Sequence, residues 1–319
     1  MRAAINQRSH ATGVRRSRLI ALPEGIADVR DLPDSEFVAL WDAILVADAL
    51  KDQILSQAVL NFTVRGKVPR ATLPLHGIIL LVGSPGTGKT SLAKGLASRT
   101  AQAFGRSGDK SFRFVEVDPH TLSSGSLGKT QRAVTELFRS TITEQAVMGP
   151  TIVLLDEVET ILADRAKLSF EANPIDVHRA TDAALVQLDQ LAGSHPDVLF
   201  VATSNFPQAI DAAFLSRVDL LVNVPPPDEA GRLAILRDTL SGMSDAFPPL
   251  RVLARSRELS TVAGEADGLD GRAMRKLVAA ACTRDKHVAL DPGLLTIELL
   301  LAAARDAVTC RDAVTGRAP

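Results

Sequence analysis

The glycine-rich segment GSPGTGKT at residues 83–90 limits the folds open to this chain more than any other part of it. It fits the pattern G-x-x-x-x-G-K-[ST] at every fixed position, and that pattern binds phosphate when it lies between a strand and a helix. The continuous apolar run Gly77–Val82 before it predicts a strand buried on both faces. Apolar residues at helical spacing from about Gly88 predict the helix that must follow. The predicted phosphate loop consists of Gly83, Ser84, Pro85, Gly86, Thr87, Gly88, Lys89 and Thr90.

Each residue type in this loop has a chemical reason to be there. Glycines let backbone N–H groups converge on phosphate oxygens, and the N-terminus of the next helix adds the positive end of its dipole. Lys89 places a charge at the β and γ phosphates, and Thr90 supplies a hydroxyl to Mg²⁺. The loop therefore predicts a nucleoside triphosphate bound together with Mg²⁺.

Two acids follow the apolar strand predicted at Thr151–Leu155. Asp156 is placed to hold Mg²⁺, and Glu157 to orient and deprotonate an attacking water. Leaving carboxylates at the end of a buried strand has a high desolvation cost, so their presence favours a function. A kinase of small molecules would not need the second carboxylate. The pair therefore indicates hydrolysis. The chain has no N-K-x-D sequence of the kind that reads guanine, so ATP is the predicted substrate.

Asn205 follows the next predicted strand, Val198–Ala202. Its amide could hydrogen-bond both the γ-phosphate and the lytic water, or it could be an ordinary turn residue. Its position at the tip of the strand after the Asp-Glu strand favours the functional interpretation.

Strand and helix patterns alternate from residue 77 to residue 224, with further strands predicted at Phe112–Val117 and Leu220–Val224. This alternation predicts an α/β fold with a doubly wound parallel sheet, as in P-loop NTPases. After Pro225–Pro227 only helical patterns remain, which predicts a small all-α lid domain. The predicted organisation is a flexible basic segment at 1–35, an ATPase domain at 36–225, the lid at 226–308 and a tail at 309–319.

Charge and cysteine content exclude several classes of protein. Because 36 Lys and Arg face 37 Asp and Glu, the net charge of -1 disfavours a strongly basic nucleic-acid binder. Cys282 and Cys310 form no C-x-x-C pair and no H-E-x-x-H sequence is present, so we expect neither a disulfide scaffold nor a structural metal. The most apolar stretch, Leu294–Ala304, is shorter than the roughly 20 residues that span a bilayer. A cytoplasmic protein without a membrane segment is expected.

The first residues carry five arginines and no acid before Glu24. This composition fits an organellar presequence, a disordered basic tail or a tail that touches a partner. No apolar helical face is evident, which favours the disordered tail.

The motifs in this order resemble the AAA+ ATPases, which combine a phosphate loop, an Asp-Glu strand, a strand-end Asn and a helical lid. The resemblance extends from about Phe37 to the C-terminus. Within AAA+ the chain looks most like the pachytene-checkpoint type, the remodellers of HORMA-domain proteins. The likeness lies in Leu155–Glu159, Asn173–Asp176, Leu185–Gln190, Ala202–Phe206, Ala213–Asp219 and Gly268–Leu277, and in Trp41 and Lys51–Leu55 before the phosphate loop.

The resemblance implies roles for individual residues. Asn205 would be the first sensor, Arg217 the arginine finger that reaches the γ-phosphate of the neighbouring subunit, and Arg272 the second sensor on the subunit's own nucleotide. A fork-shaped cation would stabilise the negative charge that grows in the transition state. Without the family, Arg217 would be interpreted as part of a surface salt bridge and Arg272 as a helix-start residue paired with Asp270. A finger acting in trans needs an oligomer, and the family implies a homo-hexameric ring.

Two positions depart from many AAA+ rings. Where a second arginine often stands near the finger, this chain has Leu220, a single-arginine pattern that the checkpoint type shares. In the pore loop the usual aromatic is replaced by Ser126, which precedes Leu127 and Gly128. Only Leu127 could grip a polypeptide by apolar contact, which puts processive threading in doubt.

About 36 residues precede the predicted helical segment. In this the chain resembles the minimal bacterial members that accompany HORMA proteins and cyclic-oligonucleotide synthases (CD-NTases) in CBASS anti-phage systems. The resemblance implies an ATP-driven remodeller that disassembles a HORMA complex and keeps the anti-phage defence inactive. Two other functions remain open: a DNA-linked AAA+ motor or clamp-loader-like ATPase, and an ATP-dependent scaffold that does not translocate. The near-neutral charge argues against the first, and Ser126 favours the second.

Overall fold

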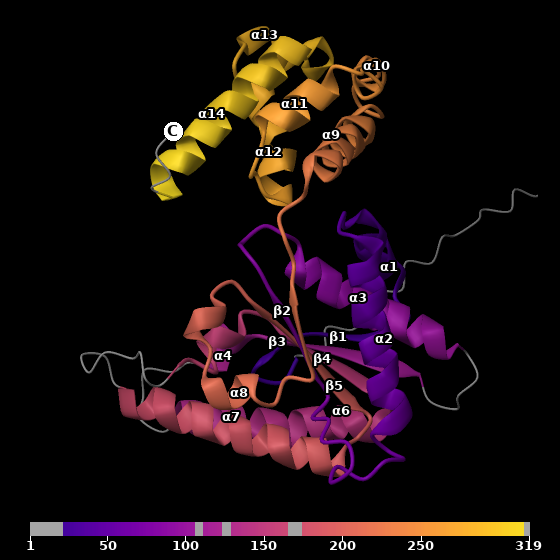
Figure 1. Ribbon diagram of the computed structural model, residues 1–319, viewed down its shortest axis with the longest axis vertical. Helices are drawn as coiled ribbons and strands as arrows, with labels where there is room; N and C mark the ends of the chain where they lie inside the picture. Colours follow the sequence, from indigo (N-terminus) through magenta and orange to yellow (C-terminus); the bar gives the residue numbers. More distant parts are fainter. Residues whose placement is uncertain (1–21, 106–110, 123–128, 165–173, 316–319) are drawn as a thin grey trace, which may run out of the picture.

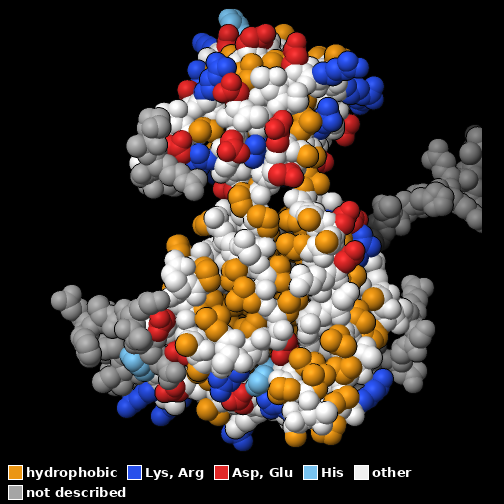
Figure 2. All heavy atoms as spheres, viewed as in Figure 1, with side chains coloured by type: hydrophobic (Ala, Val, Ile, Leu, Met, Phe, Trp, Pro, Cys, Tyr) orange, Lys and Arg blue, Asp and Glu red, His pale blue; other side chains and the backbone are white. Residues whose placement is uncertain are grey.

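The structure is a computed structural model that describes residues 22–105, 111–122, 129–164 and 174–315. A sheet with helices on both faces forms the larger part, and a separate group of helices forms the smaller part (Figure 1). A narrow waist joins the two (Figure 2). Among the described residues, no helix is both long enough and apolar enough to cross a membrane.

The sheet has the strand order β1-β3-β4-β5-β2-β6. All neighbouring pairs from β3 to β6 are parallel, and only β1 runs antiparallel, against β3. The carboxyl ends of β4, β5 and β2 therefore lie side by side at one edge of the sheet. The strands are β1 (Ile26–Leu32), β2 (Ile78–Val82), β3 (Phe112–Val117), β4 (Thr151–Leu155), β5 (Val198–Ser204) and β6 (Leu220–Asn223).

Side chains of the central strands alternate between two hydrophobic cores. In β2, Ile78 and Leu80 belong to one core, and Ile79 and Leu81 to the other. The fully apolar run that predicted a strand buried on both faces is thereby explained. The first core is covered by α5 (Lys129–Glu136), the π-helical turn η1 (Leu137–Ile142) and α7 (Pro174–Ser194), and the second by α1 (Ser35–Ala43), α2 (Asp48–Val64) and α3 (Lys89–Phe104). The predicted doubly wound α/β fold is confirmed.

Short helices complete this domain. They are α4 (Pro119–Leu122), α6 (Thr143–Met148), η2 (Val158–Thr160), η3 (Pro207–Ala209) and α8 (Ala212–Leu215).

Strand β1 corrects the prediction that residues 1–35 form a flexible segment. Its end residues Ile26 and Leu32 are buried, whereas Arg30 between them forms ion pairs with Asp28 and Glu36. Charged side chains are typical of an edge strand because they discourage pairing with a further strand, and they hide the apolar pattern. The arginine-rich start of the chain, residues 1–21, lies outside the described part.

The helical part packs around a core of its own. Leu236, Leu259, Met274 and Leu300 are completely buried in it. Its first helix begins after Asp228, whose carboxylate accepts a hydrogen bond from Gly231 N and caps the helix. The helices are α9 (Glu229–Met243), α10 (Leu250–Leu253), α11 (Leu259–Glu265), α12 (Gly271–Cys282), α13 (Lys286–Leu290), η4 (Pro292–Leu294) and α14 (Ile297–Thr315).

Helix α14 also corrects the predicted tail at 309–319. The helix continues to Thr315, past the predicted end of the lid at residue 308. Arg311 in this extension donates a hydrogen bond to the carbonyl oxygen of Asp267, which ties it to the segment before α12. The charged and small residues after residue 308 give no clear helical pattern in the sequence. Tertiary contacts stabilise the helix there instead.

Candidate active site

The phosphate loop joins the carboxyl end of β2 to the N-terminus of α3. Gly86 and Gly88 adopt left-handed backbone angles, with φ of 82° and 89°. A Cβ atom at Gly88 would lie 2.5 Å from Cδ1 of Ile44, and one at Gly86 would lie 2.3 Å from Oδ1 of Asp270. Glycine is therefore required at both positions for its backbone freedom and because its neighbours approach closely. Through these contacts the loop meets the end of α1 and the start of α12 in the helical part.

Lys89 is buried, with 5% of its surface exposed. Its ammonium group donates to the carbonyl oxygens of Gly83 at 2.8 Å and Ser84 at 2.9 Å, and to Oδ1 of Asn205 at 2.8 Å. Burial lowers the pKa of Lys89, and the nearby carboxylates of Asp156 and Glu159 oppose that shift. The site thus holds a cation against its desolvation cost by surrounding it with oxygen atoms.

Asp156 follows β4 and lies between two hydroxyl groups. Thr90 Oγ1 is 2.9 Å from Oδ1 of Asp156, and Thr203 Oγ1 also donates to that oxygen. The two residues predicted to hold Mg²⁺, Thr90 and Asp156, are therefore in direct contact in the structure.

Glu157 is the one residue other than glycine with a positive φ in the described part of the chain, at 50°. Its side chain is exposed, and its Oε1 accepts from Nδ2 of Asn205 at 3.0 Å. Asn205 in turn has its backbone N–H bonded to Oε1 of Glu159 at 3.1 Å. The structure therefore places Asn205 between Lys89 and Glu157.

These groups line a cavity of about 490 Å³ between the two domains. Ile44 and Leu45 supply part of its apolar wall, whereas Val46 packs against the core beside α1. The cavity is lined by Ala43, Ile44, Leu45, Pro85, Gly86, Thr87, Gly88, Lys89, Thr90, Ser91, Asp156, Glu157, Thr203, Asn205, Pro225, Pro227, Ile235, Gly271, Arg272, Arg275 and Lys276.

The helical part contributes three cations to this cavity, all from α12. Arg272 is exposed and makes no hydrogen bond or ion pair within the described residues, so the alternative that it pairs with Asp270 is not supported. Asp270 instead caps α12 by accepting from Ala273 N at 2.9 Å. The sequence reasoning missed Arg275 and Lys276, although their spacing of three and four residues from Arg272 puts all three on one helix face.

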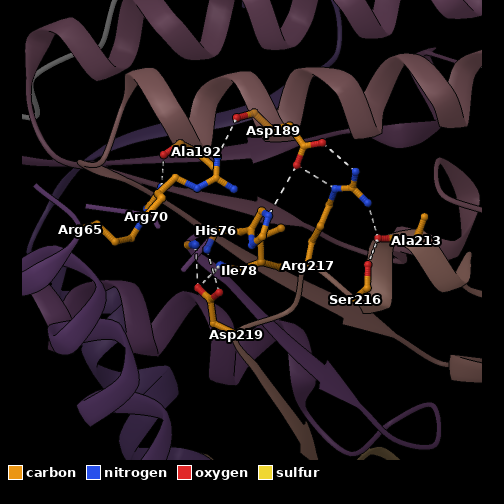
Figure 3. Close-up of polar contacts among 11 residues, drawn as sticks. Arg65, Arg70, His76, Ile78, Asp189, Ala192, Ala213, Ser216, Arg217 and Asp219 are labelled. Atoms are coloured by element: carbon orange, nitrogen blue, oxygen red, sulfur yellow. Dashed lines mark hydrogen bonds and ion pairs between the residues drawn. The ribbon is translucent and has the colours of Figure 1, made fainter. Parts of the chain in front are cut away.

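Arg217 lies elsewhere, in the segment between α8 and β6 (Figure 3). Its guanidinium forms a two-pronged ion pair with Asp189 on α7, with Nε–Oδ1 of 2.9 Å and Nη2–Oδ2 of 2.7 Å. The bonded arginine lowers the pKa of Asp189, and the carboxylate raises that of Arg217. Arg217 is not among the described residues that line the cavity of its own chain. Its partner Asp189 was not singled out from the sequence, because nothing in the spacing shows that the two meet.

The same region connects Arg217 to the base of the phosphate-loop strand (Figure 3). The carboxylate of Asp219 accepts from the backbone N–H groups of His76, Gly77 and Ile78 at 2.8, 2.6 and 3.0 Å. The His76 ring lies 3.6 Å from Asp189, and burial lowers its pKa. Arg217 is thus bound to α7 through Asp189, and the segment that carries it is bound to the start of β2 through Asp219. The predicted pore-loop residues Ser126, Leu127 and Gly128 lie outside the described residues.

Comparison with known proteins agrees with this site. A model of the ATPase family associated with various cellular activities (AAA) matches residues 79–226. CD-NTase-associated protein 6 of Pseudomonas aeruginosa is 57% identical over 290 residues, which are 91% of this chain and 94% of that protein. The pachytene checkpoint protein 2 homolog of Oryza sativa subsp. indica is 37% identical over 66% of this chain but only 44% of its own length.

The fold also matches a solved structure. A chain of the HORMA:CdnC:Trip13 complex of E. coli MS115-1 superposes with a TM-score of 0.70 at 17% identity, over 88% of this chain and 94% of that one. At this identity the match concerns the fold alone. The matching family model, the close relative in Pseudomonas aeruginosa, the phosphate loop and the lid show that the chain belongs to the AAA ATPase family, in its pachytene-checkpoint group with CD-NTase-associated protein 6.

Proposed function

We propose that this chain hydrolyses ATP and uses the energy to remodel a HORMA-domain protein. In a CBASS anti-phage system it would disassemble the complex of that protein with a CD-NTase and so act as a negative regulator. The observation that carries the hydrolytic part is the placement of Asn205 between Lys89 and Glu157, beside Thr90 and Asp156, in one cavity.

The roles follow from these positions. Lys89 and the backbone N–H groups of the loop from Gly83 to Gly88 bind the phosphates. Glu157 orients the attacking water and accepts its proton, while the amide of Asn205 fixes that carboxylate and contacts the γ-phosphate. Arg272, which has no partner within the described residues, is free to turn to the nucleotide as the second sensor.

The donor groups at the loop suit Mg²⁺. Thr90 and Asp156 offer a hydroxyl and a carboxylate within 2.9 Å of each other, and oxygen ligands of this kind are the ones that Mg²⁺ prefers. A bound Mg²⁺ neutralises charge on the phosphates. Thr90 and Asp156 therefore have the task of holding it beside the β and γ phosphates.

The choice of partner rests on the relatives. CD-NTase-associated protein 6 is named for its association with a CD-NTase, and the E. coli assembly contains a HORMA protein and CdnC beside Trip13. Identity of 57% across 91% of this chain supports the same class of partner here. We infer a cytoplasmic protein, and the free thiols of Cys282 and Cys310 are compatible with that compartment.

The active form in this proposal is a homo-hexameric ring, in which the ATPase domain includes strand β1 and the lid extends to the end of α14 at Thr315. Arg217 lies away from the described lining of its own cavity, which supports a role at the neighbour's site. Leu221 on the edge strand β6 and Phe206 beside Asn205 are 52% and 53% exposed. Hydrophobic side chains gather on the larger domain in the view of Figure 2, as expected for a domain that contacts further copies of itself. Leu127, with Ser126 and Gly128, would contact the polypeptide in the pore.

A trapped ring tests this proposal. Glu157→Gln should bind ATP and Mg²⁺ without hydrolysis and therefore retain its partner, whereas Lys89→Ala should retain nothing. Each variant is purified from its native cells with ATP, and co-eluting proteins are identified by mass spectrometry. Capture of a HORMA protein by Glu157→Gln alone is the expected result. Capture of DNA and replication proteins instead would contradict the proposal and favour a DNA-linked motor.

A further inference from the structure

Thr203 places a single hydroxyl group between the two acids that follow β4. The residue is 1% exposed and belongs to β5, two positions before Asn205. Its Oγ1 donates to Oδ1 of Asp156 and accepts from the backbone N–H of Glu157 at 3.1 Å. One side chain thus connects the carboxylate of the first acid with the backbone of the second.

The backbone of Glu157 needs such a fixed partner. Its left-handed angles, φ 50° and ψ 55°, are strained for a residue with a Cβ atom, and such strain persists only where surrounding contacts hold it. Thr203 holds the N–H side of this residue. Thr160 holds the carbonyl side, through its backbone N at 2.9 Å and through its hydroxyl. The direction of the Glu157 side chain depends on this conformation, because a relaxed backbone would turn the Cα–Cβ bond elsewhere.

The other bond of the hydroxyl acts on Asp156. Thr203 and Thr90 both donate to Oδ1 of that carboxylate, so Thr203 helps to keep its oxygens turned toward the phosphate loop. Without the hydroxyl, the N–H of Glu157 would lose its acceptor and Asp156 would lose one of its two donors. An unpaired polar group in so buried a position is costly, and the site would relax to avoid it.

We propose that Thr203 is a positioning residue for ATP hydrolysis, which fixes the direction of the Glu157 side chain and the orientation of the Asp156 carboxylate through its two hydrogen bonds. This inference rests on the hydrolytic function proposed above. It separates Thr203 from its neighbour Ser204, whose hydroxyl only accepts from Phe206 N at 3.0 Å and closes a local turn.

The chain offers a set of matched variants for the test. Thr203→Val removes the hydroxyl and keeps the shape, and Thr203→Ser keeps the hydroxyl. Thr151→Val is the control, because Thr151 is completely buried at the opposite end of β4 and its hydroxyl donates to the carbonyl oxygen of Gly149. The full chain is used, and kcat and KM for ATP, the Mg²⁺ dependence of binding of a fluorescent ATP analogue, and thermal unfolding are measured.

For Thr203→Val we expect kcat to fall by about 10- to 100-fold, the range that corresponds to losing hydrogen bonds to charged groups, with KM changed by less than about threefold. The Mg²⁺ concentration that half-saturates binding should rise. Thr203→Ser should restore both quantities, and Thr151→Val should leave both unchanged. Equal kcat in Thr203→Val and Thr151→Val, or no rescue by Thr203→Ser, would overturn the inference while wild-type turnover left the proposed function intact.

If the wild-type chain showed no ATP turnover, the proposed function would fail. The Mg²⁺ titration would still test whether Thr203 positions Asp156. A higher Mg²⁺ requirement in Thr203→Val than in Thr203→Ser supports the positioning of Asp156. Equal requirements in the two variants contradict it.

Discussion

The Lys89 side chain is almost completely buried, and its ammonium group donates hydrogen bonds to three oxygen atoms. Two of these oxygens belong to the phosphate loop itself, and the third belongs to Asn205. A phosphate group that enters the loop would compete for the same ammonium group. Nucleotide binding at Lys89 would therefore affect Asn205, which also contacts Glu157.

Replacing Lys89 with alanine should weaken ATP binding at least about 100-fold, because charge-assisted hydrogen bonds contribute roughly 1.5–3 kcal/mol each and more than one is lost. Titration of a fluorescent ATP analogue measures the effect. Lys94→Ala is the matched control, since Lys94 is also on α3 but pairs with Glu116 at 2.8 Å and does not line the described cavity. Similar affinities for the two variants would contradict the assignment.

His76 gives a prediction about pH. Burial lowers its pKa in the folded chain below the unfolded value of about 6.5, so the unfolded chain binds a proton more readily. The contribution of His76 to stability is therefore complete above about pH 6.5 and is lost as the pH falls toward the folded pKa. Urea unfolding between pH 5 and pH 7 should show a weaker pH dependence for His76→Gln than for the wild type. An unchanged slope would show that His76 does not titrate in this way.

At the scale of single residues, the sequence motifs predicted those site residues whose positions follow from local spacing along the chain. The phosphate loop, Asp156, Glu157 and Asn205 each lie at the end of a strand, so the parallel sheet brings them together. Thr203 and Asp189 could not be recognised in the same way. Their roles depend on contacts across 47 and 28 positions of sequence, with Asp156 and Arg217 respectively.

Among the secondary-structure elements, the apolar runs predicted β2, β4 and β5 because both faces of these strands are buried. Strand β1 escaped prediction because only Ile26 and Leu32 are buried in it and charged residues lie between them. Helix α12 places Arg272, Arg275 and Lys276 in the lining of the cavity. Its cap Asp270 lies close to Gly86, so the start of this helix adjoins the phosphate loop while Arg272 lines the cavity.

Arg272→Ala should weaken ATP binding about 10- to 100-fold and reduce the preference for ATP over ADP, because a cation beside the γ-phosphate contributes on the scale of a charge-assisted hydrogen bond. Competition titrations with ATP and ADP measure both quantities. Arg284→Ala serves as control, because Arg284 lies just after α12, pairs with Asp306 and does not line the described cavity. Equal loss of affinity in both variants would assign the effect to lid stability instead.

At the scale of the whole molecule, both domains line the cavity, and neither domain alone would enclose it. The α/β domain supplies the phosphate loop and the acids, and the lid supplies Arg272. Arg217, held by Asp189 on α7, is the one proposed catalytic group that does not line the described cavity of its own chain. Our account therefore requires a second copy of the chain to complete each site.

Mixing two inactive variants tests that requirement. Arg217→Ala keeps an intact phosphate site, and Lys89→Ala keeps an intact arginine, so a mixed ring contains some complete sites. Partial recovery of ATPase activity is expected on mixing, whereas Arg217→Ala mixed with the double variant should recover none. Equal activity in both mixtures would contradict a finger that acts in trans.

The most direct test of the central claim is reconstitution with a HORMA protein and a CD-NTase from the same system. The preformed complex of the two is incubated with the wild-type chain and ATP, and release of the CD-NTase is followed by size-exclusion chromatography. Our account predicts release with the wild type and none with Glu157→Gln. A complex that stayed intact while the wild type hydrolysed ATP would contradict it.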